Sequence, residues 1–180
     1  MFGRGGSNLP RKPAEVTGMT IKEAITRTDE LMPNTYSEKQ KVRWLSNLES
    51  KIIQNIWQTH WHMVAEDATA PEDPADGQLW KNPEDDKLYM YRSEKQDWVE
   101  ETRLKNFTGY TAGPDNDTLL LVPFPHDEIY VHWLETQIAY ANEEYDKYNN
   151  CNMMFRSVYQ EYSNKFNQTH DPLSQKNIYF

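Results

Sequence analysis

Helical hydrophobic spacing is confined to two separate stretches of this chain, and this division most constrains the fold. In residues 20–60 and 130–166, apolar side chains recur every three or four residues, which predicts amphipathic helices. The block between them, 66–117, lacks this spacing. Because an amphipathic helix must bury its apolar face, we expect the two stretches to pack on each other. The predicted fold is mainly α, a four-helix domain interrupted by a small antiparallel β insertion, with extended N- and C-terminal tails.

The first stretch contains signals for two helices. Thr20 and Glu23 form a capping-box pattern, and the short helix that follows should end at Met32-Pro33-Asn34. Ser37 and Gln40 form a second such pattern, which predicts a helix running to about His60. The core face of this second helix is predicted to be Leu45, Leu48, Ile52 and Ile56, with Val42 and Ile53 beside them.

The second stretch also predicts two helices. On a wheel of about 100° per residue, one stripe contains Tyr130, Leu134, Ile138, Ala141, Tyr145 and Tyr148. Asn149-Asn150 is interpreted as the break before the fourth helix. The face of that helix is predicted to be Phe155, Val158, Tyr159, Tyr162 and Phe166, and Pro172 should end it.

The middle block has the pattern of a β meander. Residues 78–81, 87–92 and 98–100 are expected to form three short strands joined by hairpin turns. A meander of this size is marginal alone and needs support from the rest of the protein. The predicted organisation is therefore a flexible arm at 1–18, a helical domain at 19–65 and 118–171, the insertion at 66–117, and an extended tail at 172–180.

The negative charge is concentrated in this middle block. Residues 64–118 contain 14 acidic and 6 basic residues, a net charge of −8 out of −9 for the whole chain. This distribution argues against specific nucleic-acid binding, which normally needs a basic surface. The apolar runs, such as Leu119–Val122, are far shorter than the roughly 20 residues of a membrane span. The sequence shows no secretory signal, and we expect a protein made in a reducing cytoplasm.

The candidates for chemistry are few. His60 and His62 are separated by one residue but follow a helix, where this spacing does not place them on one face. Glu128, His132 and Glu135 share helical spacing, but the Glu-x-x-His pair of diiron bundles is absent. Cys151 has no basic neighbour in sequence that would lower its thiol pKa. We therefore expect no catalytic, cofactor-binding or metal-binding residues, and no enzyme activity.

Surplus aromatic surface is the most distinctive feature. One row lies about 260–300° around the third helix from Tyr130, and another lies about 90–170° from the core face of the second helix. Such residues concentrate binding energy at interfaces. The predicted protein interface is Ile129, Trp133, Tyr140, Trp57, Trp61, Trp80, Tyr89, Tyr91, Trp98, Ile178, Tyr179 and Phe180. Two alternatives remain open: the insertion or the arm covers the helical rows, and Trp80, Tyr89, Tyr91 and Trp98 are the insertion's own core.

Two series of residues resemble a known family. They are 19–24, 29–34 and 37–45 in the first half, and 119–123, 130–138, 140–143, 148–155, 159–162 and 167–170 in the second. Together they resemble the head–tail connector (adaptor) proteins of tailed bacteriophages. The resemblance implies a connector-like helical subunit that forms a dodecameric ring between the portal protein and a tail protein in the virion neck. The resemblance also implies that the ring is assembled in the host cytoplasm, that DNA can pass through it, and that the C-terminal tail docks on the portal.

The insertion departs from the plain connector pattern. Residues 77–80, 88–91 and Trp98 look similar to short Trp/Tyr hairpin modules in phage tail and fibre proteins. A second interpretation of the chain is therefore a binding module. In that case Trp80, Tyr89, Tyr91 and Trp98 would form an aromatic platform for a glycan or a peptide.

Overall fold

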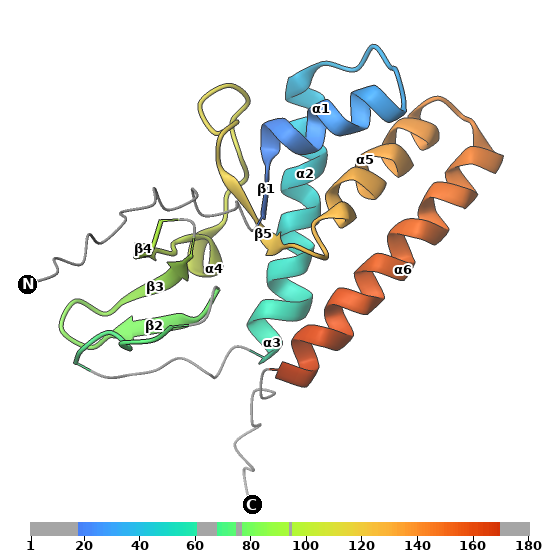
Figure 1. Ribbon diagram of the computed structural model, residues 1–180. Coiled ribbons are helices and arrows are strands. Elements are labelled where there is room, and N and C mark those ends of the chain that lie inside the picture. The colour runs from blue at the N-terminus through green and yellow to red at the C-terminus, as the bar shows by residue number, and fades with distance from the viewer. Residues whose placement is uncertain (1–17, 61–67, 75–76, 94, 170–180) are drawn as a thin grey trace, which may run out of the picture.

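The structure, a computed structural model, describes residues 18–60, 68–74, 77–93 and 95–169. Several predicted features lie outside the described residues: Trp61, His62, Pro172, residues 178–180 and nearly all of the predicted arm. The described chain contains four long helical segments and the small antiparallel sheet of the insertion, as predicted, and a second small antiparallel sheet that was not predicted. Three of the helical segments lie side by side, and the fourth crosses one end of them (Figure 1).

The first half forms as its capping signals predict. Strand β1 (Gly18–Thr20) leads into α1 (Ile21–Leu31), and the Thr20–Glu23 capping box is complete. Helix α2 (Glu38–Ile52) begins after Ser37, whose hydroxyl accepts a hydrogen bond from the Gln40 amide at 3.3 Å. It continues through a π-helical segment, η1 (Ile53–Trp57), into α3 (Gln58–His60), so the helix reaches His60, the last residue described before the gap at 61–67.

The π-helical segment corrects the predicted position of Trp57. A π-helix has more residues per turn than an α-helix, so each residue advances by less than 100° around the axis. This change of phase brings both Ile56 and Trp57 onto the core side, where they are 1% and 5% exposed. The prediction that Trp57 faces a partner protein is therefore wrong. Its indole N–H donates to the Tyr162 hydroxyl at 2.9 Å inside the subunit.

The second half contains a strand and two helices. Strand β5 (Leu119–Pro123) pairs antiparallel with β1, an element that the helical periodicity did not predict. Helix α5 (Glu128–Ala141) follows, and α6 (Tyr145–Thr169) turns back along it. The predicted halves therefore meet through the β1–β5 pair, through contacts of α5 with α1 and α2, and through contacts of α6 with η1.

The predicted helix break at Asn149-Asn150 is wrong, because both residues lie inside α6. The break occurs at 142–144, where Glu143 adopts a left-handed conformation with φ of 59°. The core stripe consequently ends with Tyr130, Leu134 and Ile138, which are all fully buried. The other three members of the predicted stripe lie at or beyond the break and are not core residues: Ala141, Tyr145 and Tyr148.

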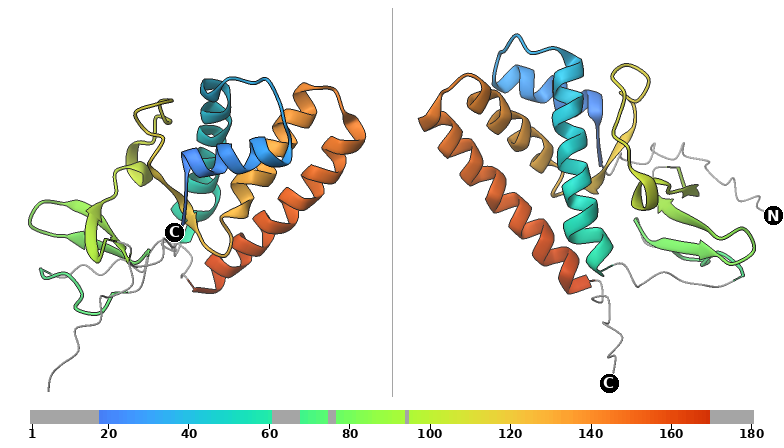
Figure 2. Two further views of the ribbon diagram at one scale, coloured as in Figure 1. Left: turned by 45° about the horizontal axis from the view of Figure 1, so that its top comes forward. Right: turned by 180° about the vertical axis from the view of Figure 1, so that it is seen from behind.

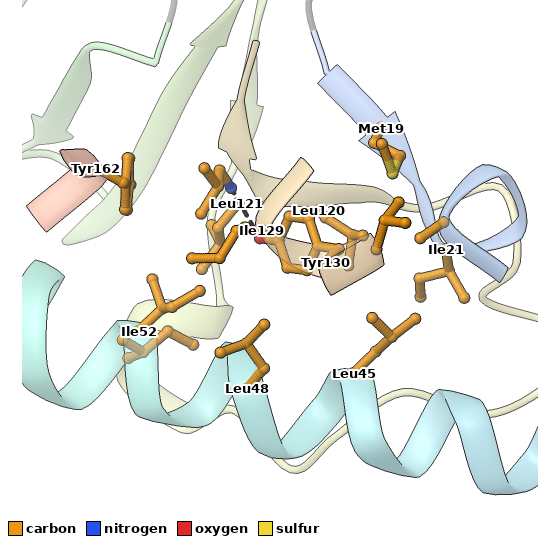
Figure 3. Packing of buried hydrophobic residues seen from close by; sticks show 14 of the residues in the cluster. Met19, Ile21, Leu45, Leu48, Ile52, Leu120, Leu121, Ile129, Tyr130 and Tyr162 are labelled. Atoms are coloured by element: carbon orange, nitrogen blue, oxygen red, sulfur yellow. Dashed lines mark hydrogen bonds between the residues drawn. The ribbon is translucent and has the colours of Figure 1, made fainter. Parts of the chain in front are cut away.

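One hydrophobic core joins both halves (Figure 3). Leu45, Leu48 and Ile52 of α2 point toward Leu120 and Leu121 of β5, and all five are 1% exposed or less. Residues from β1, α1, α5 and α6 complete this core: Met19, Ile21, Ile129, Tyr130 and Tyr162. Burial of a large aliphatic side chain contributes about 1.5–3 kcal/mol, which explains why the halves associate across the insertion.

The insertion forms the predicted meander. Strands β2 (Leu79–Asn82), β3 (Lys87–Arg92) and β4 (Asp97–Glu100) pair in sequence order. They lie to one side of α2, and α6 lies on the other side (Figures 1 and 2). Because Leu88 and Met90 belong to the same apolar cluster as the helical residues, the meander leans on the helices through one face.

Residues 101–118 return from the meander to β5 and pack closely on α2. They include the short helix α4 (Arg103–Asn106), whose Leu104 carbonyl accepts a hydrogen bond from the Gln58 amide group at 3.1 Å. The Tyr110 amide donates to the Ser46 hydroxyl at 2.9 Å. This return segment is thus bound to the helical part at several points.

Candidate functional site

A buried carboxylate, Glu49, lies where α2, β5 and the return segment meet. Its Oε1 accepts hydrogen bonds from the Leu121 amide at 2.6 Å and the Tyr110 hydroxyl at 3.2 Å. Its Oε2 accepts one from the Tyr130 hydroxyl at 2.9 Å. The side chain has no exposed surface, and burial raises the pKa of its carboxyl against the opposing effect of Arg103 at 3.9 Å.

Arg103 extends this cluster toward the surface. Its guanidinium donates to both oxygens of Glu101, with Nη2 and Oε2 at 2.6 Å, and Nη1 donates to the Leu119 carbonyl and the Tyr110 hydroxyl. Burial alone would raise the pKa of Glu101, but these bonds to Arg103 hold it below its usual range. We call Glu49, Glu101, Arg103, Tyr110 and Tyr130 the polar clasp.

The polar clasp joins the return segment to β5 and α2 and has a structural role. Strong pKa shifts often mark catalytic groups, but structural networks cause them as well. Here every member donates to or accepts from another member or the backbone of β5. The clasp therefore fixes the return segment to β5 and α2. A cavity of about 510 Å³ lies beside it, between the meander and the return segment, and Glu101, Arg103 and Tyr110 contribute to its lining.

Sequence reasoning did not find the polar clasp. One signal was present, because Glu49 lies about 40° from Leu45 on a helical wheel and therefore within the predicted core stripe. A charged residue at a core position needs partners. Those partners come from segments 54 to 81 positions further along the chain, and nothing in the local spacing indicates them.

The weaker candidates for chemistry do not assemble into a site. Glu128 forms an ion pair with Arg27, whereas His132 Nδ1 lies 2.9 Å from the Glu135 carboxylate. The three residues with helical spacing are thus not gathered around one point. Burial raises the pKa of Cys151, which favours the unreactive thiol. Within the described ranges, no group of three or more His, Cys, Asp or Glu side chains could hold a metal ion.

The three residues of the predicted interface row on α5 lie in three different environments. Ile129 is 0% exposed, and its predicted role at an interface is wrong, because α5 is enclosed by α1, α2 and α6 instead of presenting a free second face. Tyr140 is 62% exposed and contacts Tyr148 in a tilted arrangement, with ring centres 5.6 Å apart. Trp133 lies between these extremes, half-buried, and its indole N–H donates to the Trp44 carbonyl at 2.8 Å.

Trp133 contributes to a groove between α2 and α6. The groove has a volume of about 440 Å³, and the ring of Phe155 lies 5.0 Å from that of Trp133. Lys51 of α2 is placed with its ammonium group 4.9 Å from the centre of the Trp133 ring. Arg156, Tyr159 and Gln160 contribute from α6. We call this the α2–α6 groove; it combines aromatic side chains with cations.

The four aromatic residues of the meander come together as predicted. Trp80 pairs directly with Tyr89, and Tyr91 with Trp98, across the strands. The ring centres of neighbouring members are 5.2–5.7 Å apart. Trp80 is buried and the other three are half-buried. Because Leu88 and Met90 alternate with Tyr89 and Tyr91, the aromatic cluster lies on the sheet face opposite the helical core.

Comparison with known protein families, curated proteins and solved structures found no match to this chain. Among the described helices, none is both long enough and apolar enough to cross a membrane.

Proposed function

We propose that this protein is a structural virion component, a head–tail connector subunit that forms a ring between the portal and the tail. The observation that carries the proposal is the α2–α6 groove, an exposed aromatic and cationic surface on a helical framework. Its half-buried Trp133 and Phe155 supply the kind of surface that binds another protein. Most groups whose pKa is strongly shifted, such as Glu49 and Tyr130, are engaged in the polar clasp, and the hydroxyl of Tyr162 is engaged by the Trp57 indole.

The location of the connector-like residues supports the proposal. The series at 19–24, 29–34 and 37–45 falls in β1, α1, the loop after it and the start of α2. Most of the second series falls in β5, α5 and α6. These residues form the helical framework, whereas the meander lies outside them. Such a framework suits a ring subunit whose insertion varies, as the resemblance implies.

In this proposal the subunits form a dodecameric ring with the portal on one side and a tail protein on the other. The ring is assembled in the host cytoplasm and remains in the virion neck, with DNA passing through its centre. The subunit needs no cofactor. The segment 172–180, outside the described residues, is proposed to dock on the portal.

Electron microscopy of the protein with portal rings tests this function. Purified portal from the same phage, mixed with the subunit, should acquire a ring of added density at one end. A variant with Trp133→Ala should add to the portals less completely, and Tyr140→Ala is the control on the same helix. Portals that acquire no density at any subunit concentration would refute the connector function.

The aromatic cluster supports a second candidate function, a binding module for a glycan or a peptide. Tyr89, Tyr91 and Trp98 keep part of their surface open on the outer face of the meander. Aromatic faces of this kind stack on sugar rings and on peptide side chains. Binding of the intact protein to a glycan array, abolished by Trp98→Ala, would favour this function.

A further inference from the structure

The insertion exposes carboxylates that have no ionic partner. Glu72 and Asp73 precede β2, and Glu84 lies in the turn between β2 and β3. All three are exposed, and none forms an ion pair with any residue that the structure describes. These three carboxylates are therefore presented to the surroundings and are not neutralised by the described residues.

The helical framework carries a local group of basic side chains along one side of α2. Lys39, Arg43 and Lys51 follow one another at intervals of four or eight residues along α2, which places them on one ridge. Arg156 lies across the α2–α6 groove from this ridge. All four side chains are exposed, and within the described part of the chain none of them makes an ion pair.

The two charged surfaces of one subunit lie apart in the structure. The meander lies on one side of α2, and α6 lies on the other, in both the front and the rear views (Figures 1 and 2). The groove opens between α2 and α6. The acidic insertion can therefore reach such a groove only on a different molecule.

We propose that the α2–α6 groove binds the acidic insertion of a second copy of this chain. The proposal rests on the connector function and specifies how its ring closes. The insertion of each subunit contacts the groove of the next, a head-to-tail interface that forms a ring when its rotation closes. Insertions packed against each other would place like charges together, which disfavours a symmetric pairing of insertion with insertion.

The groove suits this occupant in both polarity and shape. Lys51 and Arg156 provide charge complementarity, which sets the orientation and the rate of association more than its strength. Exposed ion pairs alone contribute little. Trp133, Phe155 and Tyr159 add apolar contact at the floor and wall of the groove. The interface should accordingly weaken with increasing salt but keep a salt-independent part.

Charge reversal at both surfaces gives a decisive test. The groove variant is Lys51→Glu with Arg156→Glu, and the insertion variant is Glu72→Lys with Glu84→Lys. The control is Lys22→Glu with Lys165→Glu, two exposed lysines outside the groove that also make no ion pair with described residues. Far-UV circular dichroism confirms that each variant is folded, and sedimentation velocity at about 0.01 M salt, where the Debye length is about 30 Å, measures self-association.

The wild-type protein and the control should self-associate, and each reversal variant alone should associate about 100-fold more weakly. An equal mixture of the two variants should recover association, because each groove then meets an insertion of opposite charge. A wild-type protein that stays monomeric up to about 1 mM, reversal variants that associate normally, or a mixture that does not recover would each overturn the proposal.

The portal experiment separates this inference from the proposed function. If portals still acquire complete rings with the groove variant alone, the connector function stands and the head-to-tail contact is wrong. If the wild-type protein self-associates through the groove but never binds portals, the contact stands and the connector function is wrong.

Discussion

Removal of the Glu49 carboxylate should destabilise the protein strongly. Glu49→Ala leaves the Leu121 amide and the Tyr130 hydroxyl without their acceptor, at positions where Leu121 and Tyr130 are 1% and 0% exposed. Each buried polar group left without a partner costs about 1–3 kcal/mol. We therefore expect a loss of about 2–6 kcal/mol in the free energy of unfolding, before any contribution from the cavity.

Urea unfolding monitored by circular dichroism measures this loss. Asn47→Ala is the matched control, because Asn47 lies in the same helix as Glu49 but is exposed. This variant should change the free energy of unfolding by less than about 0.5 kcal/mol. A double-mutant cycle with Tyr130→Phe should reveal a coupling energy of about 0.5–3 kcal/mol between the two side chains. A loss below about 1 kcal/mol for Glu49→Ala would refute the structural role of the polar clasp.

Three further predictions concern the insertion, the pH dependence and α5. A Gly/Ser linker in place of residues 68–100 should leave a helical protein that unfolds cooperatively. Replacement of residues 66–117 should give a less stable protein, because it also removes Arg103 and Tyr110. Equal urea midpoints for the two variants would contradict this prediction. Because the pKa of Glu49 is raised in the folded state, its contribution to stability is greatest below the unfolded pKa of about 4.3 and falls as the pH rises toward the folded value. The stability of the wild-type protein minus that of Glu49→Gln should therefore decrease with rising pH, and a difference that increases would have the wrong sign. Ile129→Ala should cost about 2–5 kcal/mol in unfolding experiments, while Tyr140→Ala should cost less than about 0.5 kcal/mol; similar values for both would argue against the burial of Ile129.

The helices were predictable where the local sequence determines them. Thr20 and Ser37 satisfy the first amides of their helices through contacts within three residues, so their signals could be recognised without the fold. The core positions Leu45, Leu48 and Ile52 of α2 follow from α-helical periodicity. The three strands of the meander follow equally from alternation and turn residues.

The predictions failed where periodicity continued across a break or changed its phase. Tyr145 and Tyr148 extend the α5 spacing, although the chain reverses at Glu143 before reaching them. Trp57 is buried because η1 changes the helical phase. Neither event is visible in a wheel of constant angle.

Long-range contacts explain the remaining differences in the candidate site. The position of Ile129 depends on α6 closing over α5, and the polar clasp depends on the path of residues 101–118. By contrast, Trp133 was identified from its place outside the core stripe, and it does reach the edge of the groove. The cations beside it, Lys51 and Arg156, were missed because single basic residues on a helix surface are ordinary.

The β1–β5 pair bears on the order in which we expect the protein to fold. Thr20 lies opposite Leu119, so this contact forms only after a loop of 98 intervening residues has closed. Each doubling of loop length adds about 0.6 kcal/mol of closure entropy, and topologies with distant contacts fold more slowly. The α5–α6 hairpin has no such requirement, because its two helices are joined by residues 142–144. It should be formed early, and the first half of the chain should dock on it last, once the meander has already brought residues 101–118 back toward α2.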